Sequence, residues 1–365
     1  MQSRRNFLVT SAAFTSSPSF AQSETDFIAG DIGKTLISGF VGTKSGDPEV
    51  EQICEYLSRG DIAGVLLLQR NITSPEQLSE LILRFREATH ESVPIIAIDQ
   101  EGGKVARLNS SNGFLNWMSA KEMASLNMQD DQILDYYSLR AAELASVGIN
   151  VNFSPVVDLN ISPNNPIIGK LGRAFSTEPL EVVRHASLLV EAHRSANVKT
   201  CLKHFPGHGS SLTDSHLGIT DVTNTWTKQE LDPYIEMINS SIADAVMSGH
   251  LVNNKLSGGL NIPFSLSPYL SSILFDQLKF KGPIFSDDMQ MGAITQHFGL
   301  GEAARLALNA GNSFLIYSNY HKKHTINTIR DVKEAVEIEA MLGNLDLTNL
   351  NSLFIRGKDF LEDLM

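Results

Sequence analysis

Cysteine, clustered positive charge and long apolar runs are all scarce in this chain. Only two of its 365 residues are cysteine, Cys54 and Cys201, which excludes a scaffold held together by many disulfides. Basic residues number 29 against 41 acids, so the formal net charge is −12. No group of lysines and arginines occurs beyond the first five residues, and a nucleic-acid-binding surface requires grouped cations to neutralise phosphates. We therefore expect no nucleic-acid partner.

The N-terminus has the composition of an export signal. Arg4 and Arg5 lie in a Ser-Arg-Arg-Asn-Phe-Leu motif that resembles the twin-arginine signal, and Ser19-Phe20-Ala21 offers a small-residue cleavage pattern. The apolar run between them is shorter than the roughly 20 residues that span a bilayer. We predict a signal peptide over 1–21 and a periplasmic or secreted mature protein without a membrane span. The alternative is a cytoplasmic protein with an irregular N-terminal tail.

Short runs rich in Val and Ile alternate with amphipathic segments along the rest of the chain. Such runs are typical of parallel strands buried on both faces. Eight strand–helix alternations predict a single-domain α/β fold, a (β/α)8 TIM-type barrel over 27–325 with a C-terminal helical extension over 326–365. One helix start, 227–230 (TKQE), has the spacing of a capping box. An open doubly wound sheet is the competing fold, but Gly102-Gly103 lacks the third glycine of its nucleotide fingerprint. The predicted strands lie within 36–41, 64–68, 94–98, 149–157, 198–202, 245–252, 283–285 and 313–317.

Charged side chains stand where five of these strands end. In a (β/α)8 barrel the active site lies at the carboxyl ends of the strands, so these positions are the candidate functional residues. Buried charges also need partners, so some of these residues could serve only to neutralise one another. The residues at or just after the strand ends are Asp99, Glu101 and Arg107 for the third strand, Asp158 for the fourth, Lys203 and His204 for the fifth, His250 for the sixth, and Asp287 and Asp288 for the seventh.

The segment 203–218 (KHFPGHGSSLTDSHLG) gathers one lysine, three histidines and an aspartate on a loop that glycine and proline keep from becoming helical. One interpretation is a metal-dependent hydrolase. Its ligands would be His204, His208, Asp214, His216 and Asp287. However, Pro206-Gly207 prevents the helical i, i+4 register that the HExxH type of zinc motif needs. We therefore expect no metal and no other cofactor.

Five motifs occur in an order that resembles family 3 glycoside hydrolases, specifically the β-N-acetylglucosaminidase branch. They are 99–105 (DQEGGKV), 172–175 (GRAF), 203–209 (KHFPGHG), 214–216 (DSH) and 286–291 (SDDMQM), and the resemblance covers roughly residues 30 to 320.

This resemblance implies a role for each motif residue. Asp287 corresponds to the nucleophile, and His216 to the acid/base, paired with Asp214. His208 is given only a loop-shaping role. The implied sugar-binding residues are Asp99, Arg107, Arg173, Lys203 and His204.

The function implied is that of a retaining exo-β-N-acetylglucosaminidase. It would release terminal, non-reducing β-1,4-linked N-acetylglucosamine (GlcNAc) from muropeptides or chitin-type oligosaccharides through a covalent glycosyl–aspartate intermediate. The expected partner is a small carbohydrate and the expected state a monomer. The alternatives are a β-GlcNAc phosphorylase of the same family, the metal-dependent hydrolase, and a non-catalytic glycan-binding protein. Many relatives in this branch are cytoplasmic, which conflicts with the export signal.

Overall fold

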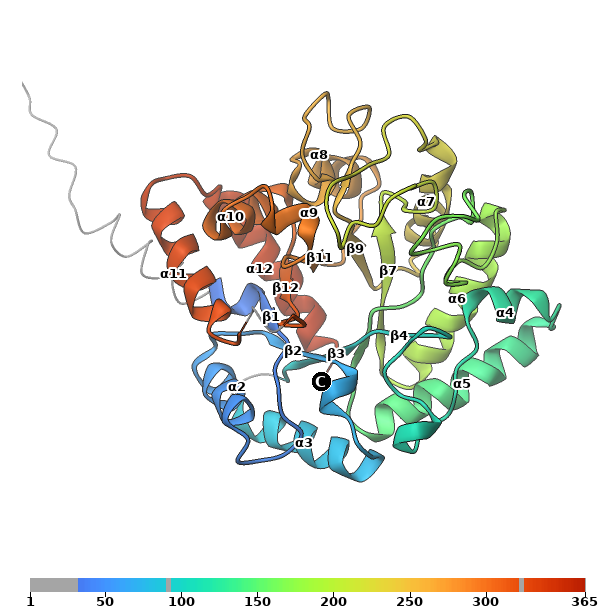
Figure 1. Ribbon diagram of the computed structural model, residues 1–365, viewed down its shortest axis with the longest axis horizontal. Helices are drawn as coiled ribbons and strands as arrows, with labels where there is room; N and C mark the ends of the chain where they lie inside the picture. Colours follow the sequence, from blue (N-terminus) through green and yellow to red (C-terminus); the bar gives the residue numbers. More distant parts are fainter. Residues whose placement is uncertain (1–31, 90–92, 322–324, 365) are drawn as a thin grey trace, which may run out of the picture.

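Eight parallel strands close into a barrel in the computed structural model, which describes residues 32–89, 93–321 and 325–364 (Figure 1). The first strand pairs with the last, placing Leu36 opposite Leu315. The predicted (β/α)8 barrel is therefore confirmed, and the open sheet is wrong, since it would leave these two strands as unpaired edges. The signal peptide predicted over 1–21 lies outside the described residues. The barrel strands, in order, are β1 (Leu36–Ser38), β2 (Gly64–Leu67), β3 (Ile95–Ile98), β6 (Val151–Asn152), β7 (Lys199–Phe205), β9 (Ala245–Ser248), β11 (Ile284–Asp288) and β12 (Phe314–Tyr317).

Helices surround the barrel, and several begin as the sequence requires. Proline occupies the first position of three of them, where its missing N–H costs nothing, and Ser74 Oγ accepts a hydrogen bond from the Gln77 amide at the start of one. Across the described residues, no helix has the length and apolar content to cross a membrane. The helices are α2 (Pro48–Arg59), α3 (Pro75–Ala88), α4 (Ala120–Ser125), α5 (Asp130–Ser146), α6 (Pro179–Ser195), α7 (Asp232–Asn239), α8 (Tyr269–Ser271), α9 (Gly292–Thr295), α10 (Leu300–Ala310), α11 (Thr328–Met341) and α12 (Leu347–Glu362).

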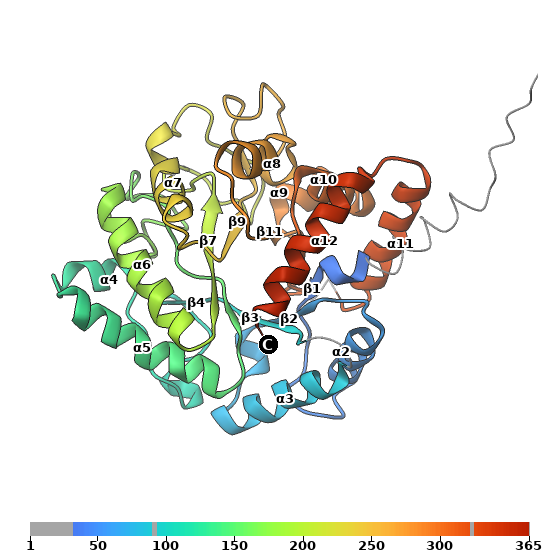
Figure 2. The same cartoon turned by 180° about the vertical axis from the view of Figure 1, so that it is seen from behind.

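The last helix, α12, closes the amino-terminal end of the barrel (Figure 2). Phe360 places its ring 5.8 Å from that of Phe285, which stacks on Phe314 at 4.7 Å inside the barrel. Cys201 is buried in the same interior cluster, as a small core residue. A cavity of about 500 Å³ opens at this end, between α12 and residues that precede the strands, such as Val198 and Pro283. It lies away from the carboxyl ends, where the candidate residues gather.

Candidate active site

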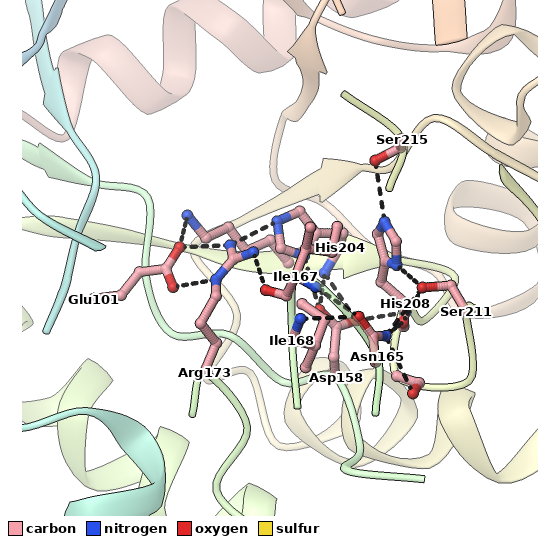
Figure 3. A network of polar contacts seen from close by, with 12 residues as sticks. Glu101, Asp158, Asn165, Ile167, Ile168, Arg173, His204, His208, Ser211 and Ser215 are labelled. Atoms are coloured by element: carbon pink, nitrogen blue, oxygen red, sulfur yellow. Dashed lines mark hydrogen bonds and ion pairs between the residues drawn. The ribbon is translucent and has the colours of Figure 1, made fainter. Parts of the chain in front are cut away.

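A buried ion network joins the residues that follow β3 to the carboxyl-terminal part of β7. Figure 3 shows the part of it formed by Glu101 and Arg173. Lys203 Nζ lies 2.9 Å from Asp99 Oδ1 and 2.6 Å from Glu101 Oε1. Arg173 donates two hydrogen bonds to the same Glu101 carboxylate, from Nε at 2.7 Å and Nη2 at 2.8 Å. Arg107 Nη2 reaches Asp99 Oδ2 at 3.4 Å. One carboxylate, Glu101, thus binds two cations, although its motif in the sequence indicated no role for it in sugar binding.

Each charged group in this network is kept in its ionised form by its oppositely charged neighbours. Burial alone would raise the pKa of Glu101, but the Arg173 and Lys203 cations outweigh it and hold this pKa at about 2. Burial would likewise lower the pKa of Lys203, but Asp99 and Glu101 raise it, so the ammonium stays charged. The Lys203 and Arg173 side chains are only 2% and 9% exposed, whereas those of Asp99 and Arg107 are 20% and 26% exposed. These residues form structural ion pairs, and the network opens to solvent at Asp99 and Arg107.

Asp158, which lies six residues beyond the end of β6, is buried and organises two histidines, His204 near the end of β7 and His208 just after it. Its carboxylate accepts hydrogen bonds from His204 Nδ1 at 2.7 Å and from the His208 amide at 2.7 Å. On the other side of the His204 ring, Nε2 lies 3.2 Å from Arg173 Nη2. Because arginine can only donate, His204 Nε2 must accept this bond, and the ring proton belongs on Nδ1, toward Asp158. The sequence had left the role of Asp158 open.

Asp214 and His216 form a close pair on the loop that follows β7. Asp214 Oδ1 accepts hydrogen bonds from both the amide and the Nδ1 of His216, each at 2.8 Å. With Nδ1–H bound to the carboxylate, Nε2 is the ring atom left to exchange a proton with a ligand. The His216 side chain is 57% exposed, so a ligand entering from solvent can reach it.

The two aspartates at the end of β11 have different surroundings. Asp288 accepts hydrogen bonds from the Gln290 and Ser318 amides and from the Ser318 hydroxyl, so its carboxylate serves the structure of the turn. Asp287 accepts only the next backbone amide among the side-chain bonds of the described residues. Burial alone would raise the pKa of Asp287, but the His216 imidazole nearby and the hydrogen bond from the Asp288 amide lower it, and the carboxylate stays ionised. Asp287 therefore presents the free carboxylate near His216.

His250 supports the carboxyl end of β11 through a hydrogen bond to Asp288. His250 is buried, its Nδ1 lies 2.7 Å from Ser265 Oγ, and its Nε2 lies 3.1 Å from the Asp288 carbonyl oxygen. A carbonyl accepts, so Nε2 carries the proton and the ring is a fixed donor to the turn after the nucleophile candidate. Burial lowers the pKa of His250, which favours this neutral form.

The capping-box prediction for 227–230 is wrong, because Glu230 is turned inward. Its Oε2 accepts hydrogen bonds from the amides of Gly209 and Ser210, at 2.9 and 3.3 Å, and its Oε1 is buried without a partner among the described residues. Glu230 thus fixes the loop that leads to Asp214. Gly207 has a φ of +118°, and a Cβ there would lie 2.6 Å from Glu230 Cβ, so the turn needs glycine.

We expect Glu230→Gln to change how stability depends on pH. Burial raises the pKa of Glu230 from 4.5 to about 7, so the contribution of this group to stability is lost as the pH rises from 4.5 through 7. The glutamine oxygen can still accept both amides but does not titrate. The difference in melting temperature, variant minus wild type, should therefore grow by a few degrees between pH 4.5 and 8.

The matched control for this measurement is Glu236→Gln, an exposed glutamate on α7, the helix that begins two residues after Glu230. Its melting-temperature difference from wild type should be flat over this pH range. A flat difference for Glu230→Gln as well would contradict the raised pKa.

His204 and His208 form hydrogen bonds to other side chains and do not come together as metal ligands. His204 Nδ1 is bound to Asp158, and both ring nitrogens of His208 lie within hydrogen-bond distance of serine hydroxyls. Within 32–89, 93–321 and 325–364, no three His, Cys, Asp or Glu side chains are placed together to hold a metal ion. The ligand set proposed for a metal-dependent hydrolase is therefore not assembled in the described structure.

A free carboxylate on one barrel strand, near a histidine–aspartate pair on the loop of another, defines a barrel enzyme built for nucleophilic and acid–base chemistry. The comparisons with known proteins are specific. Residues 41–344 match the family described as glycosyl hydrolase family 3 N terminal domain. The chain belongs to this family.

Curated relatives support the assignment. The chain is 35% identical over 273 residues to a β-hexosaminidase of Tolumonas auensis, covering 73% of this chain and 78% of that protein. It is 33% identical over 282 residues to β-hexosaminidase A of Pseudoalteromonas piscicida, covering 71% of this chain but only 46% of that longer protein.

Solved structures share the fold over almost the whole chain. A family 3 β-N-acetylglucosaminidase from Paenibacillus sp. str. FPU-7 superposes with a TM-score of 0.83 at 25% identity, covering 92% of this chain and 62% of that one. A family 3 member from Mycobacterium smegmatis gives a TM-score of 0.79 at 25% identity, covering 92% and 97% of the two chains.

Proposed function

We propose that the protein is a retaining exo-β-N-acetylglucosaminidase that acts on short glycans ending in β-1,4-linked GlcNAc. The observation that carries this proposal is the free Asp287 carboxylate near the Asp214–His216 pair. The printed activities of the relatives, β-hexosaminidase and β-N-acetylglucosaminidase, agree with it. We further propose that the protein works in the periplasm, on fragments of cell wall or chitin, as a monomer.

The proposed substrate-binding groups lie in the ion network. Lys203 uses two of its three N–H groups on Asp99 and Glu101, which leaves the third for a sugar hydroxyl. Asp99 and Arg107 are the more exposed members, and they supply an acceptor and a donor to neighbouring hydroxyls. Because these groups are already held in place, little ordering is required when the sugar binds.

The proposed reaction has two steps. Asp287 attacks the anomeric carbon while His216 Nε2–H gives its proton to the leaving oxygen, and the Asp214 carboxylate stabilises the imidazolium before transfer. His216 then removes a proton from water, which attacks the glycosyl–Asp287 ester and regenerates the free carboxylate. An imidazole, unlike a carboxylate, does not repel phosphate, so phosphorolysis is the competing second step.

We expect the protein to hydrolyse 4-nitrophenyl β-GlcNAc and GlcNAc-anhydroMurNAc much faster than 4-nitrophenyl β-glucoside. Inactivation with a 5-fluoro GlcNAc donor, followed by peptide mapping, should place the label on Asp287, because the ester accumulates when its hydrolysis is slowed. A label on another residue, or none with active enzyme, would remove Asp287 from this role.

The same assay separates the alternatives. GlcNAc-1-phosphate as the main product in phosphate buffer would establish a phosphorylase. Activity abolished by EDTA and restored by a metal would establish metal dependence. Tight binding of GlcNAc oligosaccharides without turnover would establish a glycan-binding protein.

A further inference from the structure

Ser215 stands between the two members of the acid/base pair and is itself buried. Its exposed fraction is 1%, whereas His216 beside it is exposed. Its Oγ lies 3.1 Å from His208 Nε2 (Figure 3). Asp214 and His216 otherwise lie on an open loop, so this bond is a side-chain link from the pair to the interior of the protein.

His208, at the other end of this link, is held on every polar atom. Its amide donates to Asp158 at 2.7 Å, and its carbonyl accepts from Asn165 Nδ2 at 2.7 Å. Its Nδ1 lies 2.6 Å from Ser211 Oγ, which is also bonded to Asn165. A serine hydroxyl can donate or accept, so either tautomer of His208 keeps both ring bonds. Burial lowers the pKa of His208 to about 4, so the ring remains neutral at ordinary pH.

The backbone around Ser215 rests on the segment that follows the nucleophile candidate. The first two amides of α9, those of Gly292 and Ala293, donate to the carbonyls of His216 and Ser215 at 3.1 and 3.3 Å. These amides have no partner inside the helix, so the loop carbonyls satisfy them. A Cβ on Gly292 would lie 2.8 Å from the His216 carbonyl oxygen, so any larger residue would displace the loop backbone.

We propose that Ser215 and His208 are positioning residues for the acid/base pair, and that they hold His216 at the height of the scissile bond through the hydrogen bond between them. The inference rests on the proposed function, in which His216 is the acid. It gives His208 a second role, positioning the acid/base pair, in addition to shaping the loop. Without the bond, the pair keeps its backbone contacts with α9 but loses its side-chain link to the interior, and His216 loses its fixed distance from the leaving oxygen.

The test measures kcat/KM of Ser215→Ala on two substrates with different leaving groups. Loss of acid catalysis slows the natural disaccharide but spares 2,4-dinitrophenyl β-GlcNAc, whose leaving group needs no protonation. We expect a loss of roughly tenfold on the disaccharide and less than about twofold on the activated substrate. Gly292→Ala, which displaces the same loop by another route, should show the same selectivity.

Two further variants make the outcome decisive. Thr213→Val removes a hydroxyl of the same loop that bonds Thr220 rather than His208, and it should leave both substrates within about twofold. His216→Ala is the benchmark for complete loss of the acid. If His216→Ala slows only the disaccharide while Ser215→Ala slows neither substrate, or slows both equally, the inference is wrong and the proposed function stands. If His216→Ala itself slows both substrates equally, the inference and the proposed function are both wrong.

Discussion

Asp287→Ala is expected to lower kcat by roughly 10⁴-fold or more on every GlcNAc substrate, since the proposed covalent intermediate is an ester of this carboxylate. Asp288 cannot replace it, because its carboxylate is bound to Gln290 and Ser318. The fold should survive, since Asp287 is half-buried and bonds only one amide through its side chain. Steady-state kinetics with 4-nitrophenyl β-GlcNAc, together with thermal melting, measure both effects.

Azide provides the control for this loss. A small anion can enter the space left by the carboxylate and attack from the same face, so Asp287→Ala with azide and an activated substrate should yield the α-glycosyl azide. Recovery of the α-product shows that the missing group was the nucleophile. Residual activity above about one per cent of wild type without azide would instead mean that Asp287 does not perform the chemistry.

Apart from changes to Asp287 and to the acid/base pair, Glu101→Gln should cause the largest loss of stability and activity. The substitution keeps the shape of the side chain but leaves Arg173 and Lys203 facing one buried carboxylate fewer. Removing one partner from a buried ion pair costs about 3 kcal/mol or more of unfolding free energy. Displacement of Lys203 from its place in the proposed sugar site should also lower kcat/KM by roughly 100-fold. Denaturant unfolding and kinetics measure these two effects separately.

The matched control is Glu51→Gln, which removes a carboxylate from the solvent-exposed ion pair with Arg84 and should cost less than about 1 kcal/mol. The pH gives a second check. The Glu101 pKa is depressed to about 2. The ionised carboxylate therefore contributes to the free energy of unfolding above pH 4.5, and this contribution is lost as the pH falls toward 2. The stability gap between wild type and Glu101→Gln should therefore narrow below pH 4.5. Equal costs for the two variants at neutral pH would contradict the role of burial.

The barrel could be predicted from the sequence because its strands are buried on both faces. The strands β3 and β12, which contain Ile96 and Ile316, are apolar and buried along their whole length, and this pattern does not depend on distant contacts. The strand-end residues Asp99 and Lys203 could be predicted as neighbours for the same reason, since parallel strands place their carboxyl ends at one edge.

The partners within the site could not be predicted from local pattern. Glu101 and Arg173 are 72 positions apart in the chain, and nothing near either residue indicates their bidentate pairing. Glu230 was misassigned because a Thr-x-x-Glu spacing describes a helix start equally well whether the glutamate caps it or turns into the core. Only the packing of α7 against the loop decides between these outcomes. Asn165 gave no signal, although its amide holds both His208 and Ser211.

The closure of the barrel by α12 has a consequence for synthesis. Phe360 belongs to the same interior layer as Phe285 and Phe314, yet its helix follows all eight barrel strands in the chain. During synthesis the strands therefore leave the ribosome before α12 does, and the floor of the barrel is the last part of this core to be completed.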